Sequence, residues 1–140
     1  MKSSKLMIAV TGAFLLLLVP ALAQTVAVQA TIPFSFSVGT HAMPAGDYAV
    51  SLDGWGQLRI SRVGVPGAAT ASTSAVGGNP TQDPPPKLIF NRYGNRYFLS
   101  EVWTGGTSQG HQLMISSTER EYARATKTES TTVLATRLPN

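Results

Sequence analysis

The segment GTSQG, residues 106–110, matches the G-x-S-x-G pattern of a serine nucleophile. In hydrolases with this pattern, the serine sits on a sharp turn from a buried strand into a helix, and an acidic residue and a histidine follow in that order. Here the only later histidine is His111, and no acidic residue lies between it and Ser108. We therefore interpret the match as a chance feature of a glycine-rich loop. A small secreted hydrolase that uses Ser108 or a carboxylate remains the alternative function.

Few residues could support metal, redox or acid–base chemistry. The chain has two histidines, His41 and His111, and no cysteine, so thiol nucleophiles, thiolate metal sites and disulfides are excluded. A zinc site would need both histidines and a carboxylate from remote loops, and their spacing does not support one. Asp47, Asp53 and Glu101 show no close pairing of the kind that acid–base hydrolysis uses. We predict no catalytic residue, no metal site and no cofactor, and therefore no enzymatic activity.

Aromatic and arginine side chains near two predicted turns are the candidates for binding. Trp55 lies between two glycines in a turn, where a core residue has few packing neighbours. Tyr93 flanks the tip of a second turn, with Arg92 and Arg96 beside it. Exposed Trp, Tyr and Arg side chains can stack on sugars or anchor a protein partner. We predict that these four residues bind a ligand; the alternative is that Trp55 folds back as a lid on an open barrel end.

The N-terminal residues have the pattern of an export signal. Two lysines precede an apolar run over residues 8–19, and the segment ALA at 21–23 fits the small-x-small pattern of a cleavage site. The apolar run is shorter than the roughly 20 residues that a spanning helix needs. We predict a signal peptide over 1–23, a single β-rich domain over 24–140, and a periplasmic or extracellular location without a transmembrane segment after cleavage.

The charge of the chain argues against nucleic acid as a partner. The full chain has 11 basic and 7 acidic residues, a net charge of +4, and removal of the two signal lysines leaves 9 basic residues and a net charge of +2. This excess is small, and no run of Lys or Arg could follow a phosphate backbone. An envelope polysaccharide or another exported protein is the more fitting partner.

A β-hairpin over residues 87–103 is the central predicted element. Two runs of β-branched, aromatic and leucine residues flank a Gly-Asn pair, which is typical of a type II′ turn. A two-residue loop pairs Phe90 with Leu99 and Leu88 with Glu101. One face would then carry Leu88, Phe90, Tyr97, Leu99 and Trp103, and the other Ile89, Tyr93, Phe98 and Val102. Because both faces are largely apolar, we expect the hairpin inside a stack of sheets.

Short alternating segments predict further strands. In the segment 32–38, apolar side chains alternate with Pro33 and two serines, and Pro33 favours a sheet edge because proline cannot donate to a ladder. A second hairpin is expected over 48–61. A short helix over 118–127 begins after a serine N-cap in a capping-box pattern, and 131–138 is predicted as the last strand.

Residues 77–86 mark a break in composition. They contain a glycine pair and three consecutive prolines, which predict a flexible, extended connection. We interpret it as a surface loop inside one domain, because a split here would leave each half with too little apolar surface. The predicted fold is all-β, a small antiparallel sandwich or flattened barrel of seven to nine short strands with one short C-terminal helix.

Three segments carry a resemblance to a known family. They are IPFSFSVG at 32–39, PAGDY at 44–48 and RYG at 92–94. In this pattern the chain resembles a family of small secreted bacterial proteins of unknown function, over roughly 32–125. The resemblance implies export and a β-rich fold, and it assigns no catalytic residue. The sequence therefore predicts an exported, non-catalytic protein with a binding or structural role in the cell envelope or outside the cell.

Overall fold

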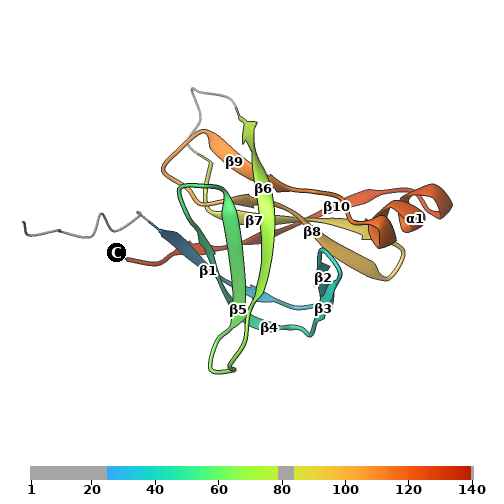
Figure 1. Ribbon diagram of the computed structural model, residues 1–140, viewed down its shortest axis with the longest axis horizontal. Helices are drawn as coiled ribbons and strands as arrows, with labels where there is room; N and C mark the ends of the chain where they lie inside the picture. The colour runs from blue at the N-terminus through green and yellow to red at the C-terminus, as the bar shows by residue number, and fades with distance from the viewer. Residues whose placement is uncertain (1–24, 79–83, 140) are drawn as a thin grey trace, which may run out of the picture.

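The computed structural model describes residues 25–78 and 84–139, which form one large, mostly antiparallel sheet and one short helix (Figure 1). The strands are β1 (Val26–Ile32), β2 (Phe36–Val38), β3 (His41–Met43), β4 (Gly46–Leu52), β5 (Gln57–Arg62), β6 (Ala69–Gly77), β7 (Lys87–Tyr93), β8 (Arg96–Trp103), β9 (Gln109–Leu113), β10 (Glu129–Leu134) and β11 (Thr136–Arg137), and the helix is α1 (Ser117–Ala125). Neighbouring strands follow the order β10-β7-β8-β9-β6-β5-β4-β1-β11, and the hairpin of β2 and β3 joins β8. The sheet is not closed into a barrel. The predicted all-β class with one short helix near the C-terminus is confirmed.

Strand β6 joins the two halves of the sheet. Its first part, 69–72, pairs with β5, and its second part, 73–77, pairs with β9. The strands β1, β4 and β5 and the strands β7 to β10 therefore form two layers that share one long strand (Figure 1). The two layers enclose an apolar core. Since the chain has no cysteine, this core is its main source of stability.

Alternation along β4 and β5 selects the side chains of one core wall. Tyr48, Val50 and Leu52 are buried, and the β4 residues between them are partly exposed. Leu58 and Ile60 of β5 stand opposite Leu52 and Val50, so the second predicted hairpin is confirmed. The other core side chains are Val28, Ala30, Ile32, Phe36, Val38, Ala69, Leu88, Phe90, Leu99, Val102 and Leu113.

The strand predicted over 32–38 is divided in two. β1 ends at Ile32 and β2 begins at Phe36, so the chain leaves β4 of the first layer and joins β8 of the second. Pro33 lies at this break because it has no N–H group to donate to a ladder. Gly39, whose φ of 59° favours glycine, then forms the tight turn into β3, where the sequence predicted only a break.

The predicted central hairpin forms from β7 and β8. Gly94 has a φ of 61° and no non-glycine residue that the structure describes has a positive φ, which agrees with a type II′ turn. Phe90 stands opposite Leu99, as predicted, and both side chains are buried in the core. The hairpin thus forms the part of the second layer that faces the core.

A β-bulge in β8 changes which side chains reach the core. Leu88 stands opposite Val102 and not opposite Glu101, because Ser100 is an extra residue without a direct partner on β7. A one-residue shift moves the side chains that follow to the opposite face of the sheet. Val102 is therefore a core residue and Trp103 lies on the outer face, which is the reverse of the predicted faces.

Helix α1 covers the outer face of β7 and β8 near their shared turn. The Ser116 hydroxyl accepts the backbone N–H of Glu119 at 3.1 Å, so the predicted serine N-cap is confirmed. The Glu119 side chain turns to the sheet, where it is buried and accepts hydrogen bonds from the Tyr93 hydroxyl at 3.1 Å and from the Asn91 amide at 3.0 Å. This buried carboxylate fixes the helix to the outer face.

Aromatic packing completes the contact between helix and sheet. The Phe98 ring lies 5.8 Å from the Tyr93 ring and 5.8 Å from the Tyr122 ring of α1, measured between centroids. The sequence predicts a helix over 118–127, close to the observed bounds of 117–125. Tyr122 is the residue whose packing against the sheet stabilises so short a helix.

The C-terminal segment, predicted as one strand over 131–138, forms two strands. The Ala135 amide between them donates to the Pro86 carbonyl at 2.9 Å, and the Leu138 amide donates to the Ala27 carbonyl at 2.9 Å. β10 therefore pairs with β7 of the second layer, while β11 pairs with β1 of the first. The last residues of the chain thus hold the two layers together.

Two sequence predictions concern residues outside the described part of the chain. The signal peptide over 1–23 lies there, as do residues 79–83 of the predicted loop over 77–86. Within the described ranges, 25–78 and 84–139, no helix is long and apolar enough to cross a membrane.

Replacement of either central core residue should weaken the fold strongly. We expect Phe90→Ala and Leu99→Ala each to lower the free energy of unfolding by about 2–5 kcal/mol, because each removes a buried side chain and leaves a cavity. Urea denaturation measures this loss. The matched control is Leu134→Ala, whose side chain is 71% exposed and should cost less than about 1 kcal/mol. A loss below about 1 kcal/mol in both core variants would contradict the assigned core.

The Tyr93 hydroxyl should make the fold sensitive to alkaline pH. Burial is the main cause that raises the pKa of Tyr93 above its ordinary value, the Glu119 charge adds to it, and a hydrogen bond with Thr128 opposes it in part. The folded state thus favours the neutral phenol, and this stabilisation is complete below about pH 10 and is lost as the pH rises through the folded-state pKa. Tyr93→Phe should be less stable than the wild type at pH 8 by about 1–3 kcal/mol, because Glu119 loses a partner.

The two proteins are compared by urea denaturation at pH 8 and pH 10.5. We expect the difference between them to shrink at the higher pH, because only the wild type has the Tyr93 proton to lose. Tyr48, whose pKa burial also raises against the opposing charge of Arg62, is present in both proteins and contributes equally. Parallel pH profiles would show that Tyr93 does not couple folding to pH.

Candidate functional site

The serine motif at 106–110 does not form a nucleophile elbow. Its last residue, Gly110, already belongs to β9, so the segment connects two strands and no helix follows it. An added Cβ at Gly110 would lie 2.5 Å from the Trp103 ring, which gives that glycine a packing role. Among the described residues, no imidazole or carboxylate is hydrogen-bonded to the Ser108 hydroxyl. Packing against Trp103 therefore explains the last glycine of the motif.

The structure does not bring the two histidines together. His41 is exposed on β3, while His111 lies on β9, where its Nδ1 is 3.4 Å from the Thr73 hydroxyl. In the part of the chain that the structure describes, no group of three or more His, Asp or Glu side chains is arranged to hold a metal ion.

Each candidate carboxylate has a structural partner. Asp47 accepts a hydrogen bond from the Thr31 hydroxyl on the neighbouring strand β1. Asp53 accepts two backbone N–H groups of its own turn, each at 2.9 Å. Glu101 accepts the indole N–H of Trp103 at 2.8 Å. These contacts explain the three acidic residues without acid–base chemistry.

The three residues predicted to bind a ligand at the second turn differ in their exposure. Tyr93 is only 4% exposed and lies beneath α1, so the expectation that it is an exposed contact residue is wrong. Arg92 is half-buried: its Nε donates to the Gly94 carbonyl at 2.8 Å, and its guanidinium lies 5.4 Å from the Tyr97 ring centroid. Arg96 is exposed at the tip of the hairpin. Sequence reasoning missed the helix as a cover for Tyr93 because helix position depends on tertiary contacts.

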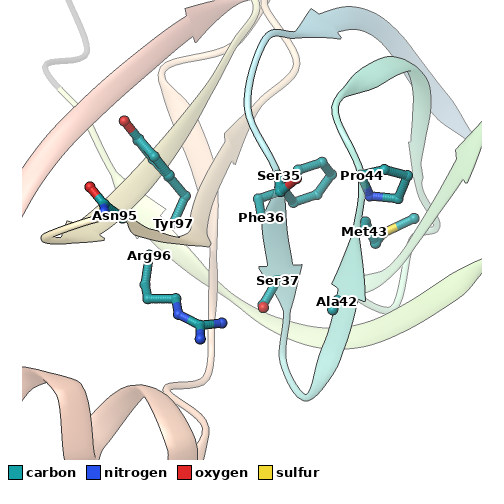
Figure 2. Close-up of a pocket in the computed structure, with 9 residues that line it drawn as sticks. All are labelled: Ser35, Phe36, Ser37, Ala42, Met43, Pro44, Asn95, Arg96 and Tyr97. Atoms are coloured by element: carbon teal, nitrogen blue, oxygen red, sulfur yellow. The ribbon is translucent and has the colours of Figure 1, made fainter.

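A groove of about 450 Å³ lies between this hairpin tip and the β2–β3 hairpin (Figure 2). It is lined by Ser35, Phe36, Ser37, Ala42, Met43, Pro44, Asn95, Arg96 and Tyr97. The groove exists because β2 and β8 are joined at a single parallel pair, Ser37 with Phe98, and no longer ladder fills the space beside it.

Polar side chains lie at the mouth and rim of the groove, and an aromatic pair supports one of its walls. Arg96 and Ser37 extend toward the same mouth of the groove in Figure 2, and Ser35 and Asn95 are exposed along its rim. The Tyr97 ring stacks on Phe34 at 3.9 Å between centroids and 14° between planes, so this wall is held in place. Hydroxyl, amide and guanidinium groups thus line a hollow of ligand size together with apolar residues such as Met43 and Pro44, and none of the lining residues is acidic.

Sequence reasoning found one of these polar residues, Arg96, and missed the others. The outward serines of the alternating segment 32–38 were a signal for Ser35 and Ser37, since alternation assigned them to the solvent side. Nothing local could place them beside Asn95, because the pairing of β2 with β8 joins segments that are remote in sequence.

Two smaller hollows lie elsewhere on the surface. One, of about 420 Å³, lies between β1 and the C-terminal segment, and its walls carry no charged side chain. The other, of about 280 Å³, lies between β3 and the β5–β6 turn and is walled largely by apolar side chains, with His41 and Arg62. The groove beside Arg96 is larger and combines several polar groups with a charge, so we take it as the candidate site.

Trp55 forms a separate exposed feature. Its side chain is 91% exposed, so the alternative that it folds back as a lid is wrong. The turn beneath it is well ordered: Asp53 accepts the N–H groups of Trp55 and Gln57, and Gly56 has a φ of 80°. In Figure 1 this β4–β5 turn lies far from the β7–β8 tip. Trp55 and Arg96 therefore do not form one contact surface.

No family model, curated protein or solved structure matches the chain. Its function must therefore be inferred from the chemistry of its own surface.

Removal of the Trp55 side chain should leave the fold intact. We expect Trp55→Ala to change the free energy of unfolding by less than about 1 kcal/mol, because the side chain makes little contact with the domain. Fluorescence tests the same exposure, since the chain has two tryptophans and Trp103 is only 8% exposed. Trp55→Phe should remove the emission that acrylamide quenches readily and leave a protected, blue-shifted signal. Loss of cooperative unfolding in Trp55→Ala would instead identify Trp55 as a structural residue.

Proposed function

We propose that this chain is an exported, non-catalytic binding protein of the cell envelope or the extracellular space. Its ligand is a hydroxyl-rich polymer, an envelope polysaccharide, which lies in the groove between the two hairpins. The observation that carries the proposal is the groove itself, a concave surface of about 450 Å³ with hydroxyl, amide and guanidinium groups on its walls.

The polar groups of the groove suit sugar hydroxyls. Ser35 and Ser37 can each donate and accept a hydrogen bond, and the Asn95 amide offers both donors and an acceptor. These side chains project from strand β2, the segment that precedes it and a tight turn, all of which the sheet holds in place. A ligand would therefore meet groups that are already positioned, which lowers the entropic cost of binding.

The absence of an acid–base arrangement in the described residues favours binding over hydrolysis. Ser108 has no hydrogen-bonded base there, and the carboxylates Asp47, Asp53 and Glu101 serve turns, strands and Trp103. The alternative, a small secreted hydrolase, therefore gains no support from any of these side chains.

The location in the envelope or outside the cell rests on the sequence. The basic residues, apolar run and small-x-small segment of residues 1–23 are typical of an export signal. The resemblance to small secreted bacterial proteins of unknown function supports the same location and stays a prediction.

A side chain that fills the groove should block binding. We expect Ser35→Trp to weaken binding of soluble polysaccharides, tested as a panel that includes dextran and polygalacturonate, by at least about tenfold. Ser35 is exposed and lies outside any strand, so the fold should tolerate the change. The matched control is Ser74→Trp, an exposed serine of β6 that does not line the groove. Affinity electrophoresis or calorimetry measures the affinity.

Three outcomes bear on this proposal. Equal binding by both tryptophan variants would show that the groove is not the site. Binding that Trp55→Ala abolishes while Ser35→Trp does not would move the site to the β4–β5 turn. An ester-hydrolase or glycosidase activity that Ser108→Ala removes would replace the proposal with the hydrolase.

A further inference from the structure

We infer that the groove recognises a negatively charged polysaccharide, whose carboxylate is bound by the Arg96 guanidinium beside the Ser37 hydroxyl. The inference rests on the proposed binding function. It adds the charge of the ligand and the residue that recognises this charge.

Arg96 is a free cation at the mouth of the groove. It is exposed and makes no ion pair with any residue that the structure describes. Its guanidinium lies 5.6 Å from the centroid of the Tyr122 ring, so α1 supports it from one side. A guanidinium positioned in this way keeps its planar fork of N–H donors available, and that fork matches the two oxygens of a carboxylate.

The guanidinium of the neighbouring Arg92 is less accessible to a ligand than that of Arg96. Arg92 stands opposite Glu129 of β10, and its Nε already donates to the Gly94 carbonyl. Arg96 pairs with Tyr93, beyond the end of β10, so no acidic residue faces it in the ladder. The carboxylate of Glu119 on α1 is buried and occupied by Tyr93 and Asn91. Of the two arginines, Arg96 is therefore the exposed one whose guanidinium has no hydrogen bond to any residue that the structure describes.

Strand geometry places a hydroxyl group beside this charge. Ser37 pairs with Phe98, and Arg96 precedes Phe98 by two residues, so all three side chains belong to the same face of the sheet. Figure 2 shows Arg96 and Ser37 extending in the same direction from opposite walls. A carboxylate at this point would accept from the guanidinium, while a neighbouring ring hydroxyl meets Ser37.

The surroundings of Arg96 favour a polysaccharide over the other anionic polymers. Nucleic acid needs several cations in a row, and Arg96 is the one cation among the described residues that line the groove. An anionic membrane surface needs a basic cluster or exposed apolar anchors at the contact. The exposed large apolar side chains, such as Trp55, Val65 and Met114, do not line the groove. Hydroxyl and amide groups around a single cation instead match a chain of sugars that carries spaced carboxylates.

The test uses two polymers that differ at one group of each sugar, which is a carboxylate in one polymer and a neutral hydroxymethyl group in the other. Polygalacturonate carries a carboxylate on each sugar, and its carboxyl-reduced form is the neutral counterpart. We expect the wild-type protein to bind polygalacturonate at least about tenfold more tightly than the reduced polymer, and to lose this preference as salt is raised. Arg96→Gln should remove the preference and leave binding of the neutral polymer unchanged. Arg96→Lys should retain part of it, because the charge remains without the fork.

The matched control is Arg59→Gln, which removes the same charge from an exposed position on β5 outside the groove. It should bind both polymers as the wild type does. An equal loss in Arg59→Gln and Arg96→Gln would reduce the effect to net charge and overturn the inference.

Failure of this inference is distinguishable from failure of the proposed function. If Ser35→Trp blocks binding of both polymers but Arg96→Gln changes neither, the groove binds polysaccharide and the charge assignment is wrong. If neither polymer binds at millimolar sugar concentration, the inference fails, and if no polysaccharide of the panel binds either, the proposed function fails with it. Arg96-dependent binding to vesicles of anionic phospholipid, with no binding to polygalacturonate, would also overturn the inference in favour of a membrane surface.

Discussion

Strand β8 carries large apolar side chains on both faces, and the fold has to cover both. Leu99 and Val102 point into the core, where the first layer of β1, β4 and β5 covers them. Phe98 and Trp103 lie on the outer face. Phe98 is covered by Tyr122 of α1, while the Trp103 ring packs against the backbone of Gly110. The strand order, the helix position and the glycines after β8 all follow from this requirement, since uncovered aromatic surface would weaken a domain that has no disulfide.

The groove lies where this cover ends. Helix α1 protects the outer face around Phe98 and Tyr93, and the β2–β3 hairpin reaches β8 through one parallel pair, Ser37 with Phe98. Between the helix and the short hairpin, serines and the tip of the β7–β8 hairpin line the groove together with apolar residues such as Met43 and Pro44. Arg96 lies on the same outer face as Tyr93, its partner in the ladder, and its guanidinium reaches the edge of the helix that covers Tyr93, 5.6 Å from the Tyr122 ring centroid.

This arrangement separates stability from recognition. The buried Glu119 carboxylate, the stacked Phe34 and Tyr97 rings and the core are all satisfied within the domain. Ser35, Asn95 and Arg96 of the groove are exposed and Ser37 is half-buried, and none of these four belongs to the apolar core. Because these polar groups contribute little to the fold, their number and charge can vary without loss of stability. Such a set suits a ligand-binding surface. A catalytic centre differs, because its groups must be positioned to act on each other.

The sequence by itself determined the elements that depend on neighbouring residues. The II′ turn follows from the Gly-Asn pair, the start of α1 follows from the capping pattern at Ser116, and the strand faces of β4 and β5 follow from period-two alternation. Only the tertiary structure decided the bulge at Ser100, the passage of the chain between layers at Pro33, and the meeting of β2 with β8. These features depend on pairing and packing between segments remote in sequence, where one residue of register reverses a face and no local propensity specifies the partner. The groove is built from such contacts, so the sequence shows its polar residues but does not predict that they lie together.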